Sequence, residues 1–356
     1  MKRKNILFII LISFLSLLIV SVILLSVIRT NYDGNVPAKV NPVEKVISVN
    51  TDNQISGEFY TTSVYCYTNM TVLQYLMVKL TKGSEISKTS TIVDLNSVKN
   101  SNSSKIQKDS SIKNAIILAY QEAGCTINYS YEGIIIHTLA VYAPDELNVG
   151  DIISGVDGHT FNNENEFMTY YNEARLDEKN YDEVTKEWNI PFIINDEEVI
   201  ISTSEYAETD NGIRYPIYGF YFYDYYSIDM ESLEPTASIN NTNTYGPSGG
   251  LMQAISVYNM LTEFDYSYGL DIAGTGTIDI NGNVGEIGGM YSKIFTAYKN
   301  GIDIFFVPYV EGSDGIADNY EDAMRAYHEL GDPQSLTLVP VSTFNDAIDF
   351  LKNYNK

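Results

Sequence analysis

The fold of this chain is decided by residues 245–261, which read Tyr245-Gly-Pro-Ser-Gly-Gly-Leu-Met-Gln-Ala-Ile-Ser-Val-Tyr-Asn-Met-Leu261. A turn is followed by apolar residues at helical spacing, which predicts a helix. Pro247 suits the first turn of that helix, where its missing N–H costs nothing. Ser248 is therefore expected at a helix N-terminus, where free amides and the positive end of the helix dipole can stabilise a developing oxyanion.

The two glycines after this serine are unfavourable in a helix. Gly249 and Gly250 each disfavour a helix interior by ~1 kcal/mol relative to alanine. Close approach of a substrate backbone is one explanation. The simpler interpretation is that Ser248 is an ordinary N-cap, because serine is common at helix starts. This segment alone does not decide between a cap and a nucleophile.

A nucleophilic serine needs a base, and no histidine lies in a suitable motif. The three histidines, His137, His159 and His328, are scattered along the chain, and His137 is typical of a strand residue. A lysine can serve instead if burial lowers its pKa from ~10.4 toward neutrality. The candidate base is therefore a lysine on a buried helix face.

The helix predicted after Gly288-Gly289 carries such a lysine. Lys293 lies three residues after Met290 and four before Ala297, on an apolar stripe. We expect Lys293 to point inward. Lys299 falls on the opposite face of the same helix and is expected to be an ordinary solvated lysine.

An apolar segment near the N-terminus predicts a membrane anchor. Ile6–Ile28 contains 23 uncharged residues, preceded by Lys2, Arg3 and Lys4 and followed by Arg29. At ~1.5 Å per residue it spans a ~30 Å hydrocarbon core. A cleavable signal peptide would have a shorter apolar region and small residues after it. The charge bias predicts a cytoplasmic N-terminus and a catalytic part outside the cytoplasmic membrane.

Four segments follow the anchor before residue 126. The pattern predicts a polar tether over 31–37, strands over 43–80, a mobile excursion over 82–111 and an amphipathic helix over 112–123 that ends at Gly124.

Beyond residue 213, tyrosines recur at alternate positions. A sugar-stacking platform is one interpretation of them, but a half-buried strand is the favoured one.

The region after Thr126 resembles the PDZ domains of bacterial envelope proteases. Its motif is Leu147-Asn-Val-Gly-Asp-Ile-Ile-Ser-Gly-Val-Asp-Gly-His-Thr-Phe161, in which Asp157-Gly158 is a strong hairpin signal. The resemblance implies a unit that recruits substrates or partners by strand addition. The charged insertion Leu176–Trp188 departs from a compact PDZ domain, and no carboxylate-binding loop is recognisable.

Composition excludes several other classes. The net charge of -24 argues against a nucleic-acid partner, which needs clustered Lys and Arg. The two cysteines, Cys66 and Cys125, are too few for a disulfide framework and wrongly spaced for zinc, although one bridge outside the cytoplasm stays an alternative. The sequence lacks H-E-x-x-H, and neither a metal nor a cofactor is expected.

Three blocks together resemble the Lon proteolytic domain, peptidase family S16. They are Gly246–Met252, Ile272–Lys293 with its Gly-Thr-Gly and Gly-Gly motifs, and Gly301–Pro308. The resemblance implies a Ser-Lys dyad. Carried over residue by residue, Ser248 matches the nucleophile, Lys293 the base and Thr275 a threonine that hydrogen-bonds the lysine, while amides near Gly246 and Gly249 would form the oxyanion hole.

Two residues depart from the family pattern. Gly249 replaces the usual alanine, which is a mild change. Tyr245 stands where Asp or Gly is usual and places a bulky ring beside the nucleophile. That ring could shape the substrate cleft or impair the turn.

The whole layout resembles the bacterial PDZ-Lon membrane proteases, the YlbL-like family. It implies an α+β chain with an N-terminal transmembrane helix, a PDZ-like β-rich domain and a Lon-type α/β domain. The expected parts are a cytoplasmic tail (1–5), the anchor (6–28), an extracytoplasmic region (29–125), the PDZ-like domain (126–203) and the proteolytic domain (204–356).

The resemblance implies an endopeptidase that cleaves exposed or unfolded protein segments. The sequence has no G-x-x-x-x-G-K-[ST] motif, so ATP-independent cleavage is expected. Lon-type domains commonly assemble into rings, which makes a homo-oligomer possible. A catalytically silent PDZ adaptor at the membrane is the main alternative, and an extracellular sugar-binding module is a third.

Overall fold

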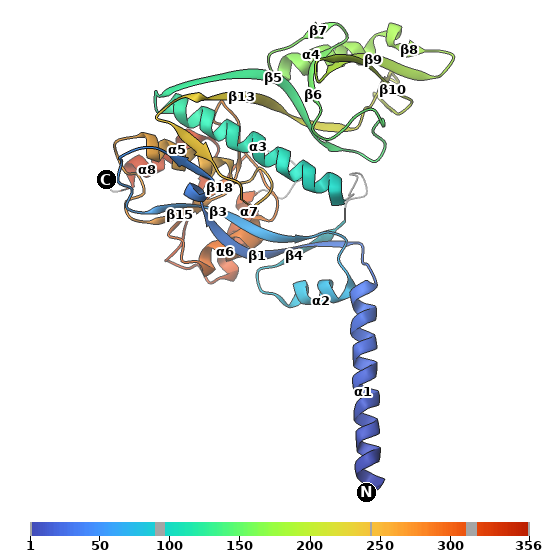
Figure 1. Cartoon of the computed structure of the whole chain (residues 1–356), viewed down its shortest axis with the longest axis vertical. Helices are drawn as coiled ribbons and strands as arrows, with labels where there is room; N and C mark the ends of the chain where they lie inside the picture. Colours follow the sequence, from blue (N-terminus) through green and yellow to red (C-terminus); the bar gives the residue numbers. More distant parts are fainter. Residues whose placement is uncertain (1, 90–96, 243, 311–318, 355–356) are drawn as a thin grey trace.

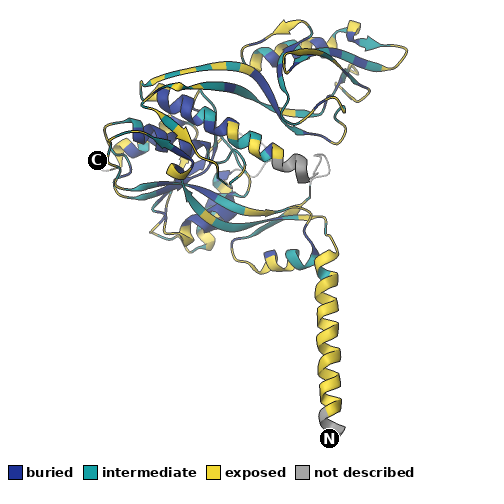
Figure 2. Cartoon of the chain, viewed as in Figure 1, coloured by how far each residue is buried: buried dark blue, intermediate teal, exposed yellow. Residues whose placement is uncertain are grey.

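The computed structural model describes residues 2–89, 97–242, 244–310 and 319–354. Helix α1 (Lys2–Val27) projects from the folded part (Figure 1). Its window Asn5–Val27 has a mean hydropathy of 3.2 and none of it is buried (Figure 2). This is the one helix in the described part of the chain that is long and apolar enough to cross a membrane. The prediction of an apolar helix over 6–28 is confirmed to within one residue at its end.

A six-stranded mixed sheet forms the centre of the folded part, in the order β19-β18-β15-β3-β1-β4. β3, β15, β18 and β19 are parallel, whereas β1 is antiparallel to both of its neighbours. The strands are β1 (Tyr32–Pro42), β3 (Glu58–Tyr67), β4 (Glu85–Lys88), β15 (Asp271–Gly274), β18 (Ile304–Pro308) and β19 (Thr337–Val341).

Helices cover both faces of this sheet. On one face lie α3 (Ser97–Glu122), α5 (Gly250–Leu261) and α8 (Phe344–Asn353), and on the other lie α6 (Met290–Lys299) and α7 (Asn319–Glu329). Alternate residues of the strands enter the two cores: Ile304 and Phe306 pack on the α5 side, and Phe305 and Val307 on the α6 side. Strands buried on both faces explain the near-continuous apolar runs in the sequence.

Three local predictions before residue 126 are wrong. The expected tether over 31–37 lies in strand β1 from Tyr32 onward, and the end of the expected strand region is helix α2 (Val72–Leu80). The expected excursion over 82–111 contains β4 and most of α3, while 90–96 lies outside the described residues. Distant partners override local composition here, since β1 pairs with β3 and α3 packs on α5. The predicted helix end is confirmed, because Gly124 is left-handed with φ 68°.

The expected boundary between 29–125 and 204–356 does not separate two sheets. β3 pairs in parallel with β15, with Glu58 opposite Asp271. Strands from both regions therefore build one domain, and the segment from Thr126 to Glu234, whose strands form a second sheet, is inserted into it. Pairing between strands this far apart leaves no periodic signal in the sequence.

A second sheet carries the inserted unit, in the order β10-β9-β6-β5-β13. Its strands are β5 (Thr126–Leu139), β6 (Ile152–Val156), β9 (Glu187–Ile194), β10 (Glu197–Thr203) and β13 (Phe220–Glu234), with β7 (His159–Thr160) and β8 (Tyr181–Asp182) paired at the side. Helix α4 (Glu164–Leu176) packs on it around Phe167. The predicted Asp157-Gly158 hairpin joins β6 to β7 with φ of 51° and 80°.

The long β5–β13 ribbon links this unit to the central domain and passes beside α3 (Figure 1). The tyrosine-rich run lies in β13 from Phe220 onward and is mostly half-buried there, which confirms the strand interpretation for this part of it. Cys66 and Cys125 are both free thiols, so the alternative of a bridge is not realised.

The remaining elements are short. They are η1 (Val43–Lys45), β2 (Ile47–Val49), η2 (Glu178–Asn180), β11 (Tyr206–Glu208), β12 (Arg214–Pro216), β14 (Ala237–Ile239), β16 (Thr277–Ile278) and β17 (Val284–Gly285).

Candidate active site

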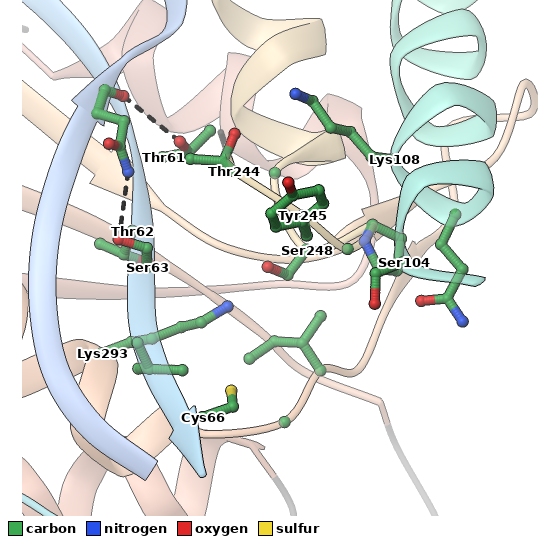
Figure 3. A pocket seen from close by; sticks show the side chains of 18 of the residues that line it. Thr61, Thr62, Ser63, Cys66, Ser104, Lys108, Thr244, Tyr245, Ser248 and Lys293 are labelled. Carbon is green, nitrogen blue, oxygen red and sulfur yellow. Dashed lines mark hydrogen bonds between the residues drawn. The ribbon is translucent and has the colours of Figure 1, made fainter. Parts of the chain in front are cut away.

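A pocket of about 830 Å³ lies between the central sheet, α3 and the loop before α5 (Figure 3). Its wall includes Ser248 from the loop, Lys293 from α6 and residues 61–66 of β3. Segments far apart in the sequence therefore meet around one cavity. Figure 3 shows the Ser248 hydroxyl and the Lys293 amine pointing toward one another inside it.

Ser248 sits just outside helix α5. The helix starts at Gly250 with Gly249 as its N-cap, so Pro247 precedes the first turn instead of forming part of it. The Ser248 carbonyl accepts hydrogen bonds from the Thr275 hydroxyl and the Gly276 N–H, both at 2.9 Å. These bonds occupy the carbonyl of Ser248 and leave its hydroxyl facing the pocket. Ser248 is consequently not a side-chain cap of α5.

One face of α3 holds the loop that carries Ser248. Residues 104, 108 and 111 follow i, i+4, i+7 spacing and so lie on the same side of the helix. The contacts are Gly246 N–H to Ser104 O at 3.0 Å, Lys108 Nζ to Thr242 Oγ1 at 2.6 Å and Ser111 Oγ to Pro247 O at 2.9 Å. The segment expected to be a mobile excursion thus fixes the position of the serine loop.

Of the two backbone amides expected near the oxyanion hole, that of Gly246 is not available. The Gly246 N–H is already occupied by the Ser104 carbonyl and cannot donate into the pocket. Within the described residues, the N–H groups of Ser248 and Gly249 donate to no carbonyl or side chain. These two adjacent amides, at the N-terminus of α5, are therefore the available donors for an oxyanion.

Gly249 has a packing reason for differing from alanine. A Cβ atom at this position would lie 3.0 Å from Cγ2 of Thr61 and 3.2 Å from Nε2 of Gln253. Both distances are tighter than ordinary van der Waals contact, so a neighbour would have to move. The glycine leaves room for the β3 side of the pocket.

Lys293 is the buried amine of the site. It lies on α6 with 3% of its surface exposed, and its Nζ donates to the Thr275 hydroxyl at 2.8 Å. Burial lowers the pKa of Lys293 to about 7, and the nearby Cys66 thiol opposes this only in part. Lys299 on the same helix is exposed. The predictions that Lys293 points inward and Lys299 outward are both confirmed.

Thr275 connects the serine to the lysine. Its hydroxyl donates to the Ser248 carbonyl and accepts from Lys293 Nζ. Because its single proton is committed to the carbonyl, only its lone pairs face the lysine. A neutral Lys293 can then direct its own lone pair toward the rest of the pocket.

Sequence reasoning missed one wall of the pocket. Cys66 and Thr61 come from β3, roughly 180 residues before Ser248, and burial raises the pKa of the Cys66 thiol. Tyr245 also lines the pocket. Its side chain is 56% exposed, so the ring lies at the border of the cavity and is not packed inside the turn that carries Ser248. The spacing of Ser104 and Lys108, four residues apart, could have indicated a shared polar face of a helix. No pattern in the sequence around Cys66 indicates that it lines a pocket.

Replacing Gly246 by alanine should destabilise the serine loop. Gly246 has φ 87°, a left-handed conformation that costs an alanine roughly 1 to 2 kcal/mol. We expect the free energy of unfolding, measured by urea titration of the full chain in detergent, to fall by about 1 kcal/mol. Gly288→Ala is the matched control, because a Cβ at either glycine would meet no atom within 4 Å but only Gly246 of the two has a positive φ. Equal losses in both variants would contradict this account.

Comparisons with known proteins match the region that contains the site. Residues 237–328, which include Ser248, Thr275 and Lys293, match the Lon protease (S16) C-terminal proteolytic domain. A Lon protease of Mesomycoplasma hyopneumoniae is 33% identical over 106 residues, and Lon protease 2 of Borreliella burgdorferi is 30% identical over 106 residues. Each alignment covers 30% of this chain but only 11% and 12% of the respective relative. A Campylobacter jejuni Lon protease is also 30% identical over 106 residues.

Proposed function

We propose that this chain is a membrane-anchored serine endopeptidase with a Ser248–Lys293 dyad. The observation that carries the proposal is Lys293, a nearly fully buried amine whose pKa is lowered to about 7 and which faces a serine hydroxyl. A buried lysine is costly to the fold, and an amine that is neutral near pH 7 can accept a proton. The match to a Lon proteolytic domain over 237–328 supports the same chemistry.

In the acylation step, Ser248 Oγ attacks the carbonyl carbon of the scissile peptide bond while its proton passes to Lys293 Nζ. The oxyanion of the tetrahedral intermediate is held by the N–H groups of Ser248 and Gly249. The Lys293 ammonium then gives its proton to the leaving amine nitrogen as the C–N bond breaks. This leaves an ester between Ser248 and the acyl half of the substrate.

Deacylation uses the same two side chains. Water attacks the ester carbonyl as Lys293 takes one of its protons, and the proton returns to Ser248 Oγ as the ester bond breaks. Thr275 keeps the amine of Lys293 in place throughout and is a positioning residue. The site needs no metal or cofactor in this scheme.

The proposal extends to location and substrates. Helix α1 crosses the cytoplasmic membrane with the N-terminus in the cytoplasm, as the flanking charges favour. The unit 126–203 acts as a PDZ-like module that recruits substrate through an exposed strand edge. Cleavage proceeds without ATP on exposed or unfolded protein segments outside the membrane, and a homo-oligomer is compatible with this scheme.

A serine-directed activity probe distinguishes this proposal from a catalytically silent adaptor. We expect the probe to label the full chain, with the adduct mapped by mass spectrometry to Ser248, and an unfolded protein to be cleaved without ATP. Ser63→Ala is the matched control, because Ser63 lines the same pocket but bonds the Lys39 carbonyl. Absence of both labelling and cleavage would favour the adaptor.

A further inference from the structure

Helix α2 has an apolar stripe on the face turned away from the protein. Leu73, Leu76, Met77 and Leu80 follow i, i+3, i+4, i+7 spacing and so share one side of the helix. Leu76 is 43% exposed, Met77 62% and Leu80 87%. The opposite side is already packed, since Val78 is buried. The fold therefore uses one apolar face of α2 and leaves a second one uncovered by the described residues.

Hydrogen bonds tie α2 to the end of α1. The Val72 N–H donates to the Ile28 carbonyl at 2.9 Å, and the Thr30 N–H donates to the Met70 carbonyl at 2.7 Å. The Arg29 guanidinium adds a bond to the Asn69 carbonyl at 3.0 Å. A capping box between Thr71 and Gln74 fixes the start of α2 at this junction. Figure 1 shows α2 beside the end of α1, running sideways from it.

The length of α1 sets the level of this junction in a membrane. The 23 residues of Asn5–Val27 extend for roughly 34 Å at ~1.5 Å per residue, close to the ~30 Å of a hydrocarbon core. Ile28 therefore lies at the boundary between acyl chains and headgroups. Since Val72 is one hydrogen bond from Ile28, α2 begins at the same boundary.

We propose that α2 lies in the interface of the bilayer that α1 crosses, with its apolar stripe among the upper acyl chains. This inference rests on the anchoring role of α1 in the proposed function. A bilayer suits the stripe better than a second protein, because α2 starts one hydrogen bond from Ile28, where the exposed apolar surface of α1 ends. The exposed Lys79 on the flank of α2 and Lys82 just after it suit the headgroup layer.

This second membrane contact orients the active site. β3 forms the pocket wall over residues 61–66 and ends at Tyr67, four residues before the Thr71 cap of α2. A single spanning helix leaves the domain free to tilt, whereas two contacts hold the pocket at a set height. The substrates best placed for cleavage are then protein segments close to the membrane surface.

Depth-dependent fluorescence quenching tests the proposal on the full chain in phosphatidylcholine–phosphatidylglycerol vesicles. An environment-sensitive dye is attached at Met77→Cys or Leu80→Cys in a Cys66→Ser, Cys125→Ser background. We expect lipids with a nitroxide high on the acyl chain to quench both dyes at least about twofold more than the controls. The controls are Lys79→Cys, on the flank of α2, and Val184→Cys, which is 90% exposed in the inserted unit.

Flotation of the vesicles separates the possible failures. If the chain floats but dyes at 77 and 80 are quenched no more than at 184, the anchor stands and the role of α2 is overturned. Cross-linking between Met77→Cys molecules without quenching also overturns it, because a second copy then covers the stripe. If the chain does not float, the anchor fails and the role of α2 fails with it.

Discussion

Replacing Ser248 by alanine should reduce peptide cleavage by at least about 10³-fold while leaving the fold intact. The substitution removes the attacking oxygen and nothing else, because the Ser248 carbonyl, not its hydroxyl, bonds Thr275 and Gly276. The measurement is kcat/KM on an unfolded protein or a fluorogenic peptide, with thermal unfolding in parallel. Neither the affinity for substrate nor the thermal stability should change appreciably.

One control variant and one competing expectation sharpen this result. Ser63→Ala removes another pocket hydroxyl and should retain activity. The catalytically silent alternative predicts that partner binding through the unit 126–203 is the only measurable activity, identical in wild type and Ser248→Ala. Substantial cleavage by Ser248→Ala would remove Ser248 from the mechanism.

Replacing Lys293 by methionine should abolish cleavage and stabilise the protein. Methionine fills a similar volume without the amine, whose charged form is disfavoured by burial. The lowered folded-state pKa means that the unfolded chain binds more protons between pH ~7 and ~10.4. Wild-type stability should therefore rise with pH across this window, and the variant should lose that dependence. At pH 7 the free energy of unfolding should increase by roughly 2 to 4 kcal/mol.

The pH dependence of activity should report the titration of the same amine. The base works only as the neutral amine, so kcat/KM of the wild type should rise with pH through an apparent pKa of about 7. Lys299→Met is the matched control on the same helix and should change neither activity nor stability appreciably. An acid limb that persists in Lys293→Met with residual activity would assign it to another group.

Local patterns predicted the elements whose cause is local. The apolar helix at the N-terminus, the helices α5 and α6 and the Asp157-Gly158 hairpin follow from spacings of two to four residues. The inward direction of Lys293 follows from the same periodicity. The functional roles of Ser248, Lys293 and Thr275 stay predictions, supported by their geometry.

Predictions failed where a distant partner decides the conformation. The polar residues over 31–37 read as a tether, yet they pair with β3 and lie between it and β4. The Ser- and Lys-rich start of α3 read as an excursion, yet Ser104 and Lys108 bond the serine loop about 140 residues later. The composition of a short segment carries no information about contacts with residues this far away in the sequence.

From the amino-acid sequence it was possible to predict the apolar N-terminal helix, the α+β class and the pair of side chains, Ser248 and Lys293, that carry the proposed chemistry. These follow from hydrophobic periodicity and from short motifs. Only the folded chain shows that β3 forms a wall of the pocket, that α3 holds the serine loop and that the Gly246 N–H is not free to bind an oxyanion. It also shows α2 beside the end of α1 with its apolar stripe outward. Each of these depends on residues far apart in the chain, whose contacts are fixed by packing and strand pairing.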